Sequence, residues 1–186
     1  MKKYLLLIII CYAGCTENVS FIKGQLPDAT CDNDIVYLVP FEGASAKTVD
    51  STFIQGSRFQ FKIKQNKHNQ IFIIRVKPLL RLNLQDILII SEPGTIFVNL
   101  NNNSSSSGTP MNETLQQWKE RKQNYSKTIY SLYKKMDDET TEVDKTLIQT
   151  EIDNLSKEYQ SFIDSLILQN QENQAGKFIS LIEKTE

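Results

Sequence analysis

Thiols, a single histidine and a group of aspartates are the side chains of this sequence that could do chemistry. Beyond residue 15 the only cysteine is Cys31, and no Cys-x-x-Cys pair occurs. One thiol cannot close an internal disulfide, so dithiol redox chemistry within this polypeptide alone is excluded. Cys31 is the candidate reactive thiol, able to pair with another molecule or be oxidised; the alternative is an inert, half-buried position.

The other polar groups give a weak case for a metal or for catalysis. His68 is the only histidine and lies in a polar turn, without a second ligand nearby. Asp28, Asp32 and Asp34 could suggest calcium, but the spacing lacks the glycine and the glutamate of an EF-hand, so a solvated loop is favoured. No Ser/His/Asp order or phosphate loop has a catalytic context. We expect no enzyme activity, no metal and no cofactor.

The first fourteen residues are typical of an export signal. Lys2 and Lys3 precede the apolar run 4–10, and small residues follow before Cys15. The apolar run is about half of the ~20 residues that a membrane-spanning helix needs. Cleavage before Cys15 would leave 172 residues, with 19 of the 21 basic side chains against 22 acidic ones. This mildly acidic balance argues against nucleic acid as a partner.

The residues around Cys15 resemble the lipobox of bacterial lipoproteins. Tyr12-Ala13-Gly14 precedes the cysteine, although an aliphatic residue is commoner than tyrosine at the first of these positions. The resemblance implies that Cys15 carries a diacylglycerol thioether and an acylated amine, and two or more acyl chains give a durable membrane anchor. Thr16 is not the aspartate that retains some lipoproteins at the inner membrane. We therefore expect an outer-membrane protein that faces the periplasm.

The elements that must position any site fall into two groups. Short apolar or alternating segments divided by turn residues predict an antiparallel β-sandwich or open barrel over residues 15–100. The clearest segment is 58–64, in which Phe59, Phe61 and Ile63 alternate with polar residues. Gln55-Gly56-Ser57 is expected to join this strand to 48–54 as a tight hairpin. The predicted strands are 20–23, 34–41, 48–54, 58–64, 71–76, 86–90 and 95–100.

The second group is helical, which makes the chain α+β. The Asn/Ser-rich segment 101–110 is expected to be a flexible linker. In 111–186, two rows of apolar residues at steps of three and four predict an antiparallel helical hairpin, with an acidic turn at 137–139. A last short helix is expected over 177–183, after a turn at 173–176. The rows are Leu115, Trp118, Tyr125, Ile129, Leu132 and Met136, then Ile148, Ile152, Leu155, Tyr159, Phe162 and Leu166.

A leucine-rich segment after Pro78 is the candidate partner-binding site. Its leucines are Leu79, Leu80, Leu82 and Leu84, with Tyr37 and Phe41 as less certain neighbours. If the last three leucines alternate as a strand, they join the core. Otherwise the four form an exposed apolar lip, and such patches commonly mark a partner surface.

Several segments together resemble a domain of unknown function that precedes the thioredoxin domain in many lipid-anchored or periplasmic thiol–disulfide oxidoreductases. The resemblance covers about residues 19–118, and more loosely the helices to 182. The activity of those proteins belongs to a thioredoxin domain with a Cys-x-x-Cys pair, and this sequence ends at Glu186 without one. The matching segments are 21–24, 36–38, 50–51, 56–61, 90–94 and 108–115.

Two functions follow as expectations. The first is a lipid-anchored, non-enzymatic module that contacts the membrane through its anchor and binds an unidentified envelope protein, peptide or glycan. The second is an accessory component of a periplasmic thiol–disulfide redox system, in which a separate protein supplies the thioredoxin domain.

Overall fold

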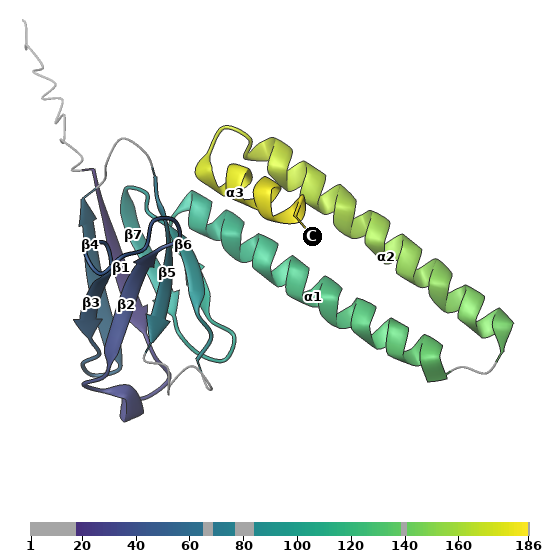
Figure 1. The fold of residues 1–186 in the computed structure, drawn as a ribbon, viewed down its shortest axis with the longest axis horizontal. Coiled ribbons are helices and arrows are strands. Elements are labelled where there is room, and N and C mark those ends of the chain that lie inside the picture. The colour runs from purple at the N-terminus through teal and green to yellow at the C-terminus, as the bar shows by residue number, and fades with distance from the viewer. Residues whose placement is uncertain (1–17, 65–68, 77–83, 139–140, 186) are drawn as a thin grey trace, which may run out of the picture.

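The computed structural model describes residues 18–64, 69–76, 84–138 and 141–185. Within these ranges the strands come first and the helices follow (Figure 1), so the predicted α+β class is confirmed. The strands are β1 (Val19–Gln25), β2 (Ile35–Pro40), β3 (Asp50–Phe53), β4 (Arg58–Lys64), β5 (Ile71–Val76), β6 (Ile87–Ile90), β7 (Gly94–Asn99) and β8 (Ser105–Ser107). The helices are α1 (Pro110–Asp138), α2 (Glu142–Gln169) and α3 (Gln174–Glu183), and a 3₁₀ turn spans Ala29–Cys31.

The strands form two four-stranded sheets that pack face to face. Sheet A has the order β4-β1-β7-β8, and sheet B has the order β3-β2-β5-β6. Alternate residues of each strand point into the space between the sheets, as Phe59 and Phe61 do from β4. The shared core takes side chains from both sheets, among them Ile22, Val36, Leu38, Phe72, Ile74, Ile89, Ile96 and Val98.

The predicted hairpin at 55–57 is wrong in one respect, because its two strands belong to different sheets. Gln55 and Arg58 form a tight bridge around Gly56 and Ser57, both with positive φ, but β3 belongs to sheet B and β4 to sheet A. In the same way, the turn at 91–93 leads from β6 in sheet B to β7 in sheet A. As a result β7 lies parallel to β1, whereas the other strand pairs are antiparallel.

The predicted flexible linker at 101–110 is wrong. Residues 105–107 form β8, which pairs with the end of β7, and Ser104, Ser106 and Thr109 are buried. The Ser104 hydroxyl donates to the Gln85 carbonyl oxygen at 2.6 Å. Serine is small enough to let backbones approach closely and can hydrogen-bond them, so this polar segment is part of the folded sandwich.

The helices form the predicted antiparallel hairpin, which extends away from the sandwich (Figure 1). At 1.5 Å per residue, α1 is about 43 Å long, and its 29 residues run through Asp137 and Asp138, beyond the predicted start of the acidic turn. The predicted turn at 173–176 is also displaced, because Asn173 caps α3 by accepting from the Gly176 amide. The inward-facing rows are buried or half-buried, including Leu115, Trp118, Leu132, Ile148, Ile152, Tyr159 and Leu166.

A buried polar cluster fixes the start of α1 to the sheets. One carboxylate oxygen of Glu92 accepts from the backbone amides of Met111 and Asn112, at 2.8 and 3.2 Å. The Asn112 side chain accepts from the Ile90 amide and donates to the Ile90 carbonyl, as a neighbouring strand would. Glu92 is 6% exposed and Asn112 fully buried. The carboxylate therefore satisfies free amides at the helix N-terminus and complements its dipole.

Candidate functional site

The outer face of sheet A carries the strongest combination of binding groups. The pairings of β4, β1 and β7 place outward residues in three cross-strand rows. All of these residues are exposed except Thr95, which is half-buried. The rows are Lys62–Phe21–Thr95, Gln60–Lys23–Phe97 and Arg58–Gln25–Asn99, and Lys64 follows at the end of β4. We call these ten residues the basic face.

The basic face has four cations and no acidic residue, in a chain whose net charge is −1. The cations are Lys23, Arg58, Lys62 and Lys64. Neither Lys23 nor Arg58 forms an ion pair with any residue that the structure describes. Lys62 instead lies over the Phe21 ring, with its ammonium 5.4 Å from the ring centroid. The face is therefore electrostatically suited to an anion.

A hollow of about 330 Å³ lies within the basic face, where two of its rows meet. Lys23 and Arg58 supply positive charge there, and Phe97 supplies an aromatic ring. Three side-chain amides complete the polar lining, and each amide can both donate and accept hydrogen bonds. They belong to Gln25, Gln60 and Asn99.

The Phe97 ring lies close to Gly108, although 49% of the residue is exposed. Gly108, just after β8, has a φ of +95°, and a Cβ added there would lie 2.7 Å from Cδ2 of Phe97 and 2.5 Å from the Thr95 carbonyl oxygen. Glycine is needed at this position both for the backbone conformation and for the close approach of the ring. Gly108 thus allows the chain beside β7 to lie close to one edge of the Phe97 ring, while about half of the residue remains accessible.

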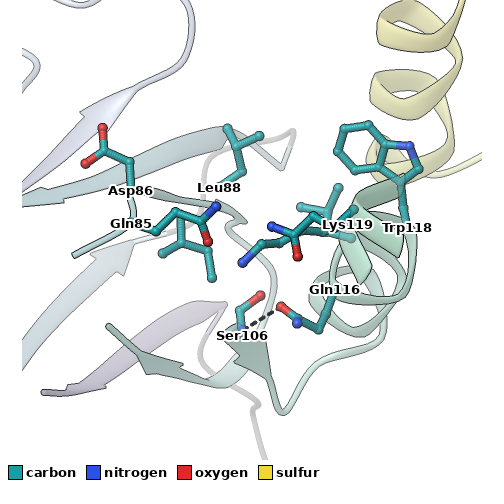
Figure 2. A pocket seen from close by; sticks show the side chains of 10 residues that line it. Gln85, Asp86, Leu88, Ser106, Gln116, Trp118 and Lys119 are labelled. Carbon is teal, nitrogen blue, oxygen red and sulfur yellow. Dashed lines mark hydrogen bonds between the residues drawn. The ribbon is translucent and has the colours of Figure 1, made fainter. Parts of the chain in front are cut away.

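A second hollow, of about 210 Å³, lies where α1 crosses the edge strands β6 and β8 (Figure 2). Leu88, Leu115 and Trp118 supply its apolar lining. Gln116 points toward β8, and its side-chain oxygen accepts from the Ser106 amide at 3.0 Å (Figure 2). The Lys119 ammonium donates to the Ser104 carbonyl, and burial lowers the pKa of Lys119. Because these groups tie α1 to β8, we assign this hollow to the joint between sandwich and helices.

The described residues give a structural role to several predicted site residues. The Cys31 thiol is buried in the sandwich core, which leaves it little access to a partner molecule. Leu84 is 7% exposed and belongs to the same core, so it does not form part of an exposed lip. Phe41 is 38% exposed and makes an edge contact with Phe178, and Tyr37 is half-buried on sheet B.

The aspartate loop is organised by backbone hydrogen bonds. The Asp28 carboxylate caps the 3₁₀ turn by accepting from Thr30, and this bonding lowers the pKa of Asp28. Both carboxylate oxygens of Asp32 accept from the turn at Gly56 and Ser57, at 2.8 Å each. Across the described ranges, no three histidine, cysteine or acidic side chains gather in a way that could hold a metal ion.

Five predicted residues lie outside the described residues, so their roles stay predictions. They are Cys15, His68, Leu79, Leu80 and Leu82. In the part of the chain that the structure describes, no helix has the length and apolar character needed to cross a bilayer.

The basic face was not predicted from the sequence. The alternation in β4 already placed Arg58, Gln60, Lys62 and Lys64 on the outer side, and 95–100 alternates in the same way around Phe97. The missing information was that β1 lies between β4 and β7, with β7 parallel to it. Without that pairing, the cations and the aromatic ring cannot be assigned to one surface.

Comparison with known protein families finds a match over the sandwich. The family described as Domain of unknown function (DUF4369) matches residues 21–115, about half of the chain. The chain belongs to this family. Comparison with curated proteins and with solved structures finds no match.

The extent of the DUF4369 match corresponds to a structural unit. It begins in β1, ends in the first turns of α1, and includes nearly the whole sandwich. Two segments that carried the sequence resemblance, 90–94 and 108–115, meet at the Glu92–Asn112 cluster. The first turns of α1 are therefore bonded into the family domain, and all of the basic face lies within the matched residues.

Proposed function

We propose that this chain is a non-enzymatic binding module of the bacterial cell envelope. In this proposal a lipid on Cys15 holds it at the outer membrane, facing the periplasm, and the basic face of sheet A contacts the ligand. The observation that carries the proposal is the hollow of about 330 Å³ on that face. It combines three amides, the exposed Phe97 ring and two cations that have no ion-pair partner among the described residues. Convergent polar groups around an aromatic surface are typical of a binding site.

The arrangement of the helices supports this choice of surface. α1 contacts β6 and β8 and, together with α3, packs against Ile71, Leu88 and Ile90 of sheet B. The strands that carry the basic face, β4, β1 and β7, lie away from that contact, and their outward residues are exposed. A ligand can therefore approach sheet A without displacing a helix.

Site-specific photo-crosslinking in the native envelope tests the proposal. A photoreactive phenylalanine analogue replaces Phe97 in the full-length chain, and a matched variant carries it at Phe53, which is 57% exposed on sheet B. We expect an adduct from position 97 and none from position 53. Equal labelling at the two positions, or no adduct at position 97, would overturn the proposal.

The thioredoxin-associated role remains the alternative. In that role a thioredoxin domain on another chain would supply the Cys-x-x-Cys pair. Burial of Cys31 gives that role no support from this chain's own thiol.

A further inference from the structure

We propose that the ligand of the basic face is an acidic oligosaccharide, with carboxylates on its sugar rings. This inference rests on the proposed function and adds the chemical class of the ligand. An acidic sugar has a flat apolar ring face, several hydroxyls and a negative charge. The hollow in the basic face offers a matching group for each of these three features.

The positions of the groups come from the pairing of the strands. Phe97 lies directly beside Lys23 across β7 and β1, and Gln60 lies on the other side of Lys23. Arg58, Gln25 and Asn99 form the next row, two residues further along each strand. Neighbouring strands are about 4.8 Å apart, and residues two apart along a strand are about 6.7 Å apart. The cations and the amides therefore lie beside Phe97, mostly on the β1 side of β7, at distances within reach of a bound sugar.

Phe97 is the ring that remains open for stacking. The other exposed ring of the face, Phe21, already lies under the Lys62 ammonium. Within the described residues no cation lies over Phe97, and Gly108 lies close to one edge of its ring. An aromatic side chain has only two rotatable side-chain bonds, so it loses little conformational freedom when a ligand packs on it.

The charge of the face selects for acidic sugars over neutral ones. Lys23 and Arg58 have no acidic partner among the described residues, so a carboxylate would not have to compete with an internal ion pair. The three amides can pair with hydroxyls in either direction.

The same geometry argues against single-stranded nucleic acid. Such ligands stack successive bases on several aromatic side chains, and this face offers one uncovered ring.

The test measures binding of an alginate hexasaccharide, a uronate oligomer, to the full-length chain in non-ionic detergent micelles by titration calorimetry. Cellohexaose serves as the neutral probe, and poly-L-glutamate and a deoxythymidine oligomer serve as other polyanions. We expect the uronate oligomer to bind in preference to all three. We also expect added salt to weaken its binding, because salt screens exposed charges.

Substitutions within the basic face test whether the oligosaccharide binds there. Phe97→Ala, and separately the pair Lys23→Ala with Arg58→Ala, should weaken uronate binding by at least about tenfold, the equivalent of one charge-assisted contact. The matched control is Lys127→Ala with Lys134→Ala, which removes the same charge from exposed positions on α1 and should leave binding unchanged. Unaltered thermal midpoints would show that every variant is folded.

Several results would overturn the inference. Equal binding of cellohexaose would remove the requirement for charge, and equal binding of poly-L-glutamate or the deoxythymidine oligomer would indicate a general polyanion surface. An equal loss of binding in the α1 control would show that binding depends on the net charge of the protein and not on the basic face. A crosslink at position 97 without uronate binding would overturn the ligand class alone, whereas failure of both experiments would overturn the proposed function as well.

Discussion

At the scale of single residues, Glu92 and Asn112 determine how the two parts of the molecule join. Glu92 is an acidic side chain with 6% exposure, and its carboxylate accepts three hydrogen bonds from the first turn of α1. Asn112 pairs with both backbone groups of Ile90. Each side chain thus satisfies backbone groups that burial would otherwise leave without a partner.

Replacing Glu92 with alanine tests this role. We expect Glu92→Ala to lower the free energy of unfolding by about 2–3 kcal/mol, because it removes a charged helix cap and leaves buried amides unpaired. Urea denaturation followed by circular dichroism measures the loss. Glu113→Ala is the matched control, since Glu113 is an exposed acid in the same helical turn and should cost less than about 1 kcal/mol. Equal losses in the two variants would contradict the capping role.

At the scale of elements, hydrophobic periodicity predicted the strands and helices that have one apolar face. It missed a strand that forms only through pairing with distant residues. The alternation in 58–64 and the two apolar rows of the helices predicted β4, α1 and α2, because one face of each is buried. β8 consists of three serines and has no apolar residue to reveal it. Its strand character comes from pairing with β7 and from the hydrogen bond between Ser106 and Gln116 of α1.

Trp118 is a buried side chain of α1 that packs against α3. It is 8% exposed, contacts Phe178 of α3 edge-on at 6.0 Å, and donates to Glu183 at 2.7 Å. Trp118→Ala should cost about 3–5 kcal/mol because it leaves a cavity. Thermal unfolding measures the change. The control is Tyr130→Ala, because Tyr130 is on the same helix and is 72% exposed, so its removal should leave the thermal midpoint nearly unchanged. An unchanged midpoint for Trp118→Ala would refute its place in the core.

At the scale of the whole molecule, the candidate site depends on assembly more than on any one segment. The outward positions of Lys23, Arg58 and Phe97 could each be inferred from alternation along their own strands. Their proximity arises because the chain returns to sheet A twice, placing β1 between β4 and β7. Such long-range pairing leaves no pattern in a single sequence, so the fold class was predictable and the face was not.

Attachment to the membrane through Cys15 is also tested on the whole molecule. If a lipid on Cys15 holds the chain, Cys15→Ser should move the protein from the membrane fraction to the soluble fraction or leave its signal uncleaved. Fractionation of the envelope with immunoblotting measures this, and Cys31→Ser is the matched control because Cys31 is buried in the core. Membrane association that survives Cys15→Ser would contradict the anchor.

The parallel pairing of β1 with β7 has a mechanical consequence. A pull on the chain that enters β1 acts where that strand begins, beside the start of β7, whereas a pull on the chain that leaves β7 acts beside the end of β1. In a parallel pair these are opposite ends, so the two strands are loaded in shear. Their hydrogen bonds then resist together instead of opening one after another. A pull applied between the start of β1 and the end of β7 would thus act on the sandwich in its stronger direction.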